Sequence, residues 1–387
     1  MTTPLSIQRI SFNRDGTSLT VCHDDGYAIY DLPESFNSAS LNVVFEHTGT
    51  TRMLIAERLS SILMLVAGDK LRRLQVYNMK RREQLQVHDY TSSVKAVKLN
   101  RNRCVVCVDS MIFVYDSRKM ENLHTIKDTP KIHDGIVDLS LSEGSCYLAY
   151  PGTTAGHVNI FDANLLTAAG TIAAHESELA AIKFNHDGTL LATASAKGTV
   201  IRVFSIPSGE RLFEFARGFK RTVTIHSLAF SMDSKYLCSS SNTETVHVFS
   251  LERGHDDSDP KNAESEEAVD QGWVGYLTPY VTPYLPQQVN DIMLRRGSFA
   301  TAYLPIGGMK TTCAMPRINN KDYLIVASND GILFCYEIPT LTGVCNLVKQ
   351  FKLGAGTDEN DALYDSTTIK VSPTATAPPS PVDEEQQ

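Results

Sequence analysis

A short cationic segment, Glu214-Phe-Ala-Arg-Gly-Phe-Lys-Arg221, lies between two stretches that have the pattern of β-strands. Its cations are Arg217, Lys220 and Arg221, and Gly218 follows the first of them. A solvated turn can have this composition, and so can a binding site for an anion. The flanking residues are therefore needed to choose between the two.

The flanking strands add basic, imidazole and hydroxyl side chains. The basic and imidazole residues are His175, Lys197, Arg202 and His247, and the hydroxyls are those of Thr193, Ser195, Thr199, Ser239, Ser241, Thr243 and Thr245. In sequence order, Thr193, Ser195, Lys197 and Thr199 align with Ser239, Ser241, Thr243 and Thr245, which predicts two equivalent polar edges. Arg, Lys and clustered hydroxyls donate hydrogen bonds from several directions, as phosphate recognition requires. An ordinary turn remains the alternative at this point.

No pattern of catalytic or metal-binding residues accompanies this set. The chain contains no GxxxxGK[ST], GxGxxG, GxSxG or HExxH motif. His133-Asp-Gly and His186-Asp-Gly fit hairpin turns. Cys104 and Cys107 form a CxxC inside a strand-like run, where positions i and i+3 face opposite ways, so we expect no metal there. We predict a protein that is not an enzyme and has no cofactor, with reduced cysteines in its core.

A repeat of 38 to 47 residues indicates which elements position the polar edges. A short apolar strand that ends in an aromatic residue recurs seven times, ending at Tyr30, Tyr77, Tyr115, Phe161, Phe204, Phe249 and Tyr336. The last interval, 87 residues, equals one period plus an insertion of about 40 residues. Such periods with several short strands are typical of WD40-like blades, so we predict an all-β, seven-bladed β-propeller. The Trp-Asp dipeptide is absent, which makes the repeats degenerate.

The net charge of −8 is unevenly distributed along the chain. Residues 252–270 carry eight acids against two cations, and residues 357–387 carry seven against one, so each segment contributes −6 and the rest about +4. This balance argues against a nucleic-acid-binding protein but permits a local basic patch. We expect no signal peptide, because MTTPLSIQRI has no apolar region behind a basic start, and no membrane span, because no apolar run approaches 18 residues.

The sequence resembles the PROPPIN or WIPI family, phosphoinositide-binding seven-bladed propellers of autophagy, and most of all the WIPI subgroup of the core machinery. The resemblance covers about residues 5–350 and is dense in LNRNR, LAYPG, AAHESELAAI, KGTVIRVF, SLAFSMDS and SSNTETVHVF. Family members carry Phe-Arg-Arg-Gly where this chain has Phe215-Ala-Arg-Gly218. In the family, each arginine serves one of two headgroup pockets for phosphatidylinositol 3-phosphate and the 3,5-bisphosphate.

By this resemblance, Ala216 removes the main phosphate ligand of one pocket. Site one would comprise His175, Ser195, Lys197, Thr199 and Arg202, and site two would comprise Arg217, Gly218, Ser239, Ser241, Thr243, Thr245 and His247. The missing contact should weaken site one by about 1.5–3 kcal/mol. We therefore expect one competent and one weakened site. The alternative is a lipid-independent scaffold in which both sites have decayed.

An insertion after the sixth anchor strand carries a second membrane-related pattern. Its second half contains exposed-type aromatic and aliphatic residues: Trp273, Tyr276, Leu277, Tyr280, Val281, Tyr284 and Leu285. Prolines among them disfavour a continuous helix, and such side chains favour a bilayer interface. We predict a membrane-inserting loop over 252–297, with packing against the propeller as the alternative.

The resemblance also implies protein partners. Arg101 and Arg103 in LNRNR would dock an ATG16-type partner, although a solvated hairpin fits these residues equally well, and an ATG2-type partner is also expected. We predict a propeller over 1–356 and a disordered tail over 357–387. The expected location is the cytoplasm, peripherally on preautophagosomal, autophagosomal and endosomal membranes.

Overall fold

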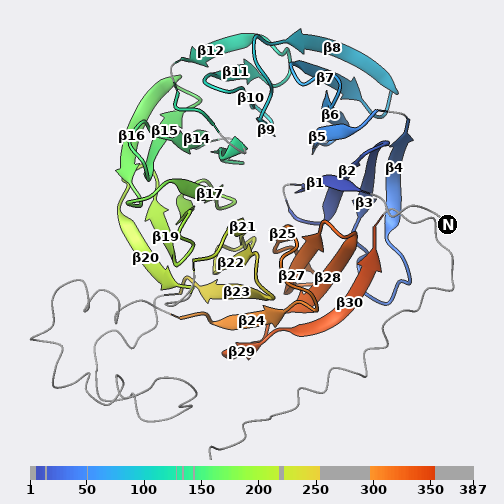
Figure 1. The fold of residues 1–387 in the computed structure, drawn as a ribbon, viewed down its shortest axis with the longest axis vertical. Helices are drawn as coiled ribbons and strands as arrows, with labels where there is room; N and C mark the ends of the chain where they lie inside the picture. The colour runs from blue at the N-terminus through green and yellow to red at the C-terminus, as the bar shows by residue number, and fades with distance from the viewer. Residues whose placement is uncertain are drawn as a thin grey trace, which may run out of the picture. The chain divides into compact units, whose positions relative to one another are not determined.

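The computed structural model describes residues 6–353 except 14, 50, 128, 133–134, 143, 218–221 and 253–296. The chain divides into two compact units, Met1–Gly354 and Ala355–Gln387, and all described residues lie in the first. They form seven sheets around a common axis, a seven-bladed β-propeller (Figure 1). The predicted fold class is confirmed. The segment predicted to be a disordered tail lies outside the described residues.

Each blade runs from an inner strand near the axis to an outer strand at the rim (Figure 1). Blades 1 and 2 contain β1 (Ile7–Phe12), β2 (Ser18–His23), β3 (Gly26–Asp31), β4 (Asn42–Thr48), β5 (Met53–Leu59), β6 (Ile62–Ala67), β7 (Arg73–Asn78) and β8 (Glu83–Asp89). Blades 3 and 4 contain β9 (Ala96–Leu99), β10 (Arg103–Cys107), β11 (Ile112–Asp116), β12 (Asn122–Ile126), β13 (Asp138–Leu139), β14 (Tyr147–Pro151), β15 (His157–Asp162) and β16 (Thr167–Ala173).

Blades 5 to 7 contain the remaining strands. Blade 5 consists of β17 (Leu179–Phe184), β18 (Leu190–Ser195), β19 (Val200–Ser205) and β20 (Arg211–Ala216). Blade 6 consists of β21 (Ile225–Phe230), β22 (Tyr236–Ser241), β23 (Thr245–Ser250), β24 (Ala300–Tyr303) and the short β29 (Gly343–Val344). Blade 7 consists of β25 (Thr311–Ala314), β26 (Arg317–Ile318), β27 (Lys321–Ser328), β28 (Ile332–Glu337) and β30 (Asn346–Lys352).

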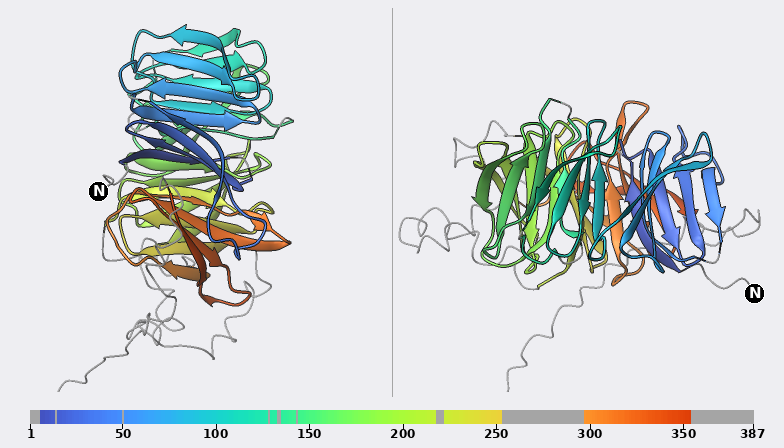
Figure 2. Two further views of the ribbon diagram at one scale, coloured as in Figure 1. Left: turned by 90° about the vertical axis from the view of Figure 1, so that its right-hand side faces the viewer. Right: turned by 90° about the horizontal axis from the view of Figure 1, so that it is seen from above.

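The seven predicted anchor strands are the third strands of the seven blades: β3, β7, β11, β15, β19, β23 and β28. Most of their apolar residues are buried. Each blade lies between two others in the ring, and the side views show the blades edge-on (Figure 2). The CxxC of β10 illustrates this, since Cys104 packs toward blade 2 and Cys107 toward blade 4. Burial raises the pKa of the Cys104 thiol to about 12. These cysteines are therefore core residues on opposite faces, as predicted.

Blade 1 and blade 7 meet through side chains. Blade 1 is built entirely from the first four strands, and the strands of blade 7 all come from residues 311–352. Leu19 and Val21 of blade 1 share a core with Ile325, Leu333 and Phe351 of blade 7. The ring is thus closed by apolar packing between its first and last blades.

The insertion falls within blade 6. Strand β23 ends at Ser250, and β24 begins at Ala300 and pairs with it antiparallel. The residues predicted to insert into a membrane, from Trp273 to Leu285, lie outside the described residues.

Candidate anion-binding site

The outer strand of blade 5, β20, points successive residues toward different blades. Cross-strand pairing places Glu214 beside Arg202 and Ala216 beside Val200, which puts these residues on one face. Phe215 faces the other way and stacks on Phe249 of blade 6, with 4.7 Å between ring centroids. Position 216 therefore faces away from blade 6, and Arg217, the next residue, reaches toward it.

Arg217 is held by hydroxyls of the β22–β23 turn. Its backbone N–H donates to the carbonyl of Thr199 at 3.0 Å, and its Nη2 donates to the hydroxyls of Ser241 and Thr243. Burial lowers the pKa of this guanidinium. Among the described residues no carboxylate pairs with it, and its buried Nε has no hydrogen-bond partner. Within the described part of the chain this partly buried positive charge therefore has no counterion, which is unfavourable unless an anion binds.

A chain of polar contacts continues from Arg217 to His247. The hydroxyls of Ser241 and Thr243 lie 3.0 Å apart, those of Thr243 and Thr245 3.2 Å apart, and Thr245 Oγ1 lies 3.3 Å from His247 Nε2. Burial, reinforced by the charge of Arg217, lowers the pKa of His247 to about 4. The imidazole is consequently neutral near pH 7. The structure brings these predicted site-two residues together, with Ser239 paired directly opposite His247.

The predicted site one differs from site two because its arginine is already paired. Arg202 Nε donates to Glu214 Oε2 at 2.7 Å, and Arg202 Nη1 donates to the carbonyl of Ala174 at 2.6 Å. Arg211 also contacts Glu214, at 2.8 Å. The charge of Arg202 is thus compensated within blade 5. Ala216 supplies no cation, and Lys197 is exposed at the adjoining turn.

His175 forms the other buried contact of site one. Its Nε2 lies 2.9 Å from Thr193 Oγ1, and the side chain is buried. Burial, followed by the charge of Arg202, lowers the pKa of His175 to about 4. Ser195 is buried at the end of β18. A neutral imidazole and a compensated arginine make this edge a weaker attractor for anions than the edge around Arg217.

The predicted equivalence of Thr199 and Thr245 is wrong. Cross-strand pairing sets Thr193 opposite Arg202 in blade 5 and Ser239 opposite His247 in blade 6. The turn of blade 6 is therefore one residue shorter, and counting from the third strand makes Glu244 the equivalent of Thr199. The prediction aligned the two turns by counting residues in sequence order, and it therefore overlooked this one-residue deletion. The equivalences of Thr193 with Ser239 and of Ser195 with Ser241 remain.

Three further predicted site residues are Gly218 and the two arginines predicted to dock a partner, Arg101 and Arg103. Gly218 lies outside the described residues. Arg103 is partly buried, and its Nε donates to the carbonyl of Ala163 in blade 4 at 2.7 Å, which gives it a structural role between blades. Arg101 is exposed in the β9–β10 turn. Of the two, only Arg101 is exposed.

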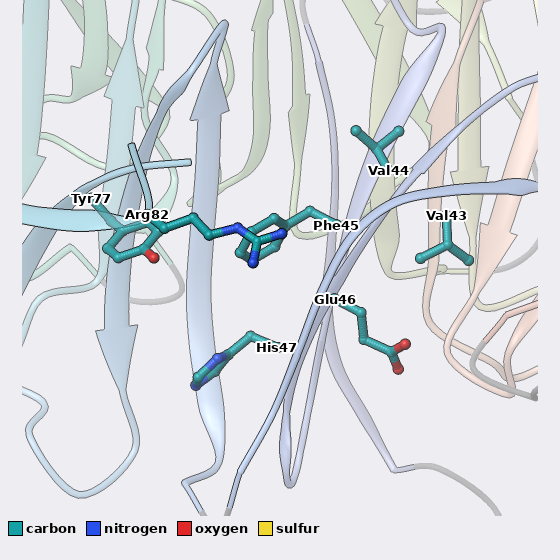
Figure 3. Close-up of a pocket in the computed structure, with 7 residues that line it drawn as sticks. All are labelled: Val43, Val44, Phe45, Glu46, His47, Tyr77 and Arg82. Carbon is teal, nitrogen blue, oxygen red and sulfur yellow. The ribbon is translucent and has the colours of Figure 1, made fainter. Parts of the chain in front are cut away.

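Sequence reasoning did not identify two surface pockets between neighbouring blades. One, of about 410 Å³, lies between β4 and the β7–β8 region, where Phe45 and His47 face Tyr77 and Arg82 while Val43 and Glu46 turn away (Figure 3). The other, of about 570 Å³, lies between blades 2 and 3 and is lined by His88, Tyr90, Phe113 and Tyr115 among others. Aromatic residues in and after the third and fourth strands of blades 1 to 3 were the available signal. Their proximity depends on how adjacent blades meet.

The described residues contain no cluster of three or more His, Cys, Asp or Glu side chains arranged to hold a metal ion. Within the same residues, no helix is long and apolar enough to cross a bilayer.

Fold and site define the class of this protein as a seven-bladed β-propeller in which an arginine of blade 5, Arg217, contacts hydroxyls of blade 6. The chain belongs to the PROPPIN family, whose family profile matches residues 6–354. The predicted family membership is thus confirmed.

Individual relatives agree with this assignment. Autophagy-related protein 18 of Caenorhabditis elegans is 41% identical over 373 residues, which cover 94% of this chain and 90% of that protein. WD repeat domain phosphoinositide-interacting protein 1 of Homo sapiens is 42% identical over 361 residues, covering 92% of this chain and 79% of that protein. Among solved structures, Kluyveromyces lactis Hsv2 matches with a TM-score of 0.65 at 19% identity, covering 90% of this chain and 100% of that one. That structure supports the fold.

Proposed function

We propose that this chain binds phosphoinositides through the pocket around Arg217 and acts in autophagy as a peripheral membrane protein. Relatives over 40% identical are named as phosphoinositide-interacting or autophagy-related proteins, which supports this class of function. The finer proposal is recognition of phosphatidylinositol 3-phosphate and 3,5-bisphosphate on preautophagosomal, autophagosomal and endosomal membranes, followed by recruitment of autophagy proteins.

One observation carries the proposal. Arg217 is partly buried, contacts the hydroxyls of Ser241 and Thr243, and has no carboxylate partner among the described residues. A phosphate monoester would compensate this charge and accept hydrogen bonds from the guanidinium and the hydroxyls together. Arg202 already donates to Glu214, so its charge is compensated without a bound anion. The two predicted sites are therefore unequal, with site two the stronger.

Vesicle flotation tests this proposal. We would compare the wild type with Arg217→Ala and Ala216→Arg on vesicles with and without phosphatidylinositol 3-phosphate. A charged hydrogen bond contributes about 1.5–3 kcal/mol, so Arg217→Ala should weaken binding at least tenfold and Ala216→Arg should strengthen it. Arg118→Ala, which removes an exposed arginine from blade 3, is the matched control for net charge.

The scaffold alternative makes a different prediction. If none of the folded proteins floats with the phosphorylated lipid, the lipid proposal is wrong and a lipid-independent scaffold replaces it. Binding that falls equally in Arg217→Ala and Arg118→Ala would indicate non-specific attraction to an anionic surface. Flotation on vesicles that contain the 3,5-bisphosphate would then show which of the two headgroups binds more tightly.

The insertion is proposed to add a second membrane contact on sequence grounds. A tethered contact acts at a millimolar effective concentration and can raise affinity by about 10²–10⁴. Replacing Trp273, Tyr276 and Leu277 together by Ser should therefore weaken flotation. Unchanged flotation by the folded triple variant would contradict this role.

Partner recruitment is proposed through blades 2 and 3. The structure of KlAtg21 in complex with the coiled coil of AgAtg16 is similar to this chain, with a TM-score of 0.67 and 24% identity. We propose that exposed Arg101 contacts an ATG16-type coiled coil, with an ATG2-type protein as a further partner. Arg101→Glu should abolish capture of a purified coiled coil, whereas Lys352→Glu on blade 7 should not. Retained capture by Arg101→Glu would contradict this docking site.

A further inference from the structure

The end of β24 and the connection that follows it expose apolar side chains in blade 6. Tyr303 and Ile306 are each 59% exposed, and Pro305 between them is also exposed. We refer to residues 303–306 as the blade-6 rim. An exposed apolar group of this kind is typical of a surface that contacts a partner or a membrane.

The strand register places the rim beside the chain of hydroxyls that leads to Arg217. Tyr303 pairs directly with Thr245, and Thr301 pairs with His247, so these four residues share one face of blade 6. The face is the one on which Phe249 packs against Phe215 of blade 5, because Phe249, His247 and Thr245 alternate along β23. Tyr303 therefore lies one strand outward from the hydroxyl chain that leads to Arg217.

The turn between β22 and β23, which contributes the hydroxyl of Thr243 to the Arg217 site, also accepts hydrogen bonds from the backbone around the rim. Leu304 N–H donates to the carbonyl of Glu244 at 2.7 Å, and Gly308 N–H donates to the carbonyl of Asn242 at 3.1 Å. Leu304 is buried, and the hydroxyl of Tyr336 donates to the carbonyl of Tyr303 at 2.6 Å. These bonds fix the backbone on either side of Ile306. Its exposure is thus a feature of an anchored connection.

A bound lipid would bring a bilayer to this position. A phosphorylated headgroup bound at Arg217 would keep its glycerol and acyl chains in the membrane, so the residues beside Arg217 would meet the lipid surface. Tyrosine favours the bilayer interface, and an isoleucine side chain favours the apolar region beneath it. Glu244 in the same turn is exposed and acidic, so apolar contact rather than charge is the basis of this inference.

We propose that the blade-6 rim is a membrane-contacting element in which Tyr303 and Ile306 enter the bilayer interface next to a headgroup bound at Arg217. This inference rests on the proposed function of the Arg217 pocket. It assigns a membrane contact to the propeller itself, separate from the insertion between β23 and β24.

The experiment separates headgroup binding from membrane contact. Calorimetry with soluble inositol 1,3-bisphosphate measures the pocket alone, and flotation on phosphatidylcholine vesicles containing phosphatidylinositol 3-phosphate measures both. The double variant Tyr303→Ser/Ile306→Ser should bind the soluble headgroup like the wild type but bind vesicles about tenfold more weakly, or about 1.4 kcal/mol. Leu165→Ser, which removes a 73% exposed leucine from blade 4, should change neither measurement.

A fluorescent variant gives a second readout. Because Trp273 is the chain's only tryptophan, Ile306→Trp in a Trp273→Phe background reports on the rim alone. Its emission should shift to shorter wavelength when vesicles are added and should be quenched by brominated lipid. No shift on vesicles to which the protein binds would overturn the proposal.

The remaining outcomes also decide the matter. Equal vesicle binding by the wild type and the double variant contradicts the rim contact while leaving the headgroup site intact. If the wild type binds neither soluble headgroup nor vesicles, the proposed function fails and the rim inference fails with it. If the wild type sediments as a dimer and the double variant as a monomer, the rim is a self-association surface instead.

Discussion

Arg202 and Arg217 belong to the same blade edge but differ in electrostatic state. Glu214 compensates Arg202 at 2.7 Å, whereas hydroxyls alone contact Arg217 among the described residues. A compensated arginine must give up its partner before it binds an anion, and this competition lowers affinity. If lipid binds as proposed, residue 214 should therefore influence the affinity through its contact with Arg202.

This difference gives a residue-scale prediction. Glu214→Gln keeps the shape of the side chain but removes its charge, so Arg202 and Arg211 become available to an anion at site one. Vesicle binding should become several-fold tighter, and the gain should be larger in Arg217→Ala, where site one acts alone. Flotation of the four combinations measures the coupling. A loss of binding in Glu214→Gln would mean that Glu214 orients Arg202 for the headgroup.

The buried imidazole of His175 makes stability depend on pH. Its pKa is lowered from 6.5 to about 4 by burial, so the unfolded chain binds the proton more readily than the folded one. The contribution of the neutral imidazole to the free energy of unfolding is complete above about pH 6.5 and is lost as the pH falls toward 4. Between pH 7 and pH 5 the loss should be about 2 kcal/mol.

Denaturant unfolding of wild type and His175→Gln at both values isolates this contribution. Gln can still accept a hydrogen bond from Thr193 but does not titrate. The pKa values of His88, His226 and His247 are also lowered, so only the difference between the two proteins is informative. Equal acid sensitivity of the two proteins would contradict the assignment.

At the scale of elements, the turn between β18 and β19 depends on Gly198. Its φ is +64°, and an added Cβ would lie 1.9 Å from the carbonyl oxygen of Val223, in the segment that leads into blade 6. Gly198→Ala should therefore destabilise the fold by about 1–3 kcal/mol from the backbone conformation alone. The clash adds to this and should displace Lys197 as well.

Thermal unfolding tests the role of this turn. Gly170→Ala is a suitable control, because a Cβ at that position meets nothing within 4 Å. A melting temperature for Gly198→Ala equal to that of the control would show that the turn adapts without cost.

At the scale of the whole molecule, ring closure depends on packing between blades 1 and 7. Leu333 is fully buried in their shared core, so Leu333→Ala should cost about 2–5 kcal/mol. Because blade 1 contributes no strand to blade 7, the loss should open this interface first. Hydrogen exchange should rise in β1, β2, β27 and β28.

The matched control for ring closure is Leu148→Ala, in the core between blades 3 and 4. Leu148 is also fully buried, so the cost in unfolding free energy should be similar. Its increased exchange should be confined to those two blades. Identical exchange maps for the two variants would contradict a separable closure.

Local periodicity was sufficient to predict the blade architecture. The anchor strands recur at the period of one blade, so their apolar pattern predicted one such strand in each of seven blades and an insertion between the sixth and the seventh of them. The residue types around Arg217 likewise indicated an anion site. The blade prediction is confirmed because it depends on residues near in sequence and on repetition, whereas the anion site stays a prediction.

The relative states of the two sites were decided only by the tertiary structure. Composition cannot show that Glu214 compensates Arg202, that the blade-6 turn is one residue shorter, or that Tyr303 lies opposite Thr245. Each of these depends on cross-strand register, and Thr245 and Tyr303 are separated by the whole insertion. The sequence by itself therefore determined the blades and the kinds of side chain at their edge. Their pairing required the fold, because charge compensation depends on distances between residues far apart in the chain.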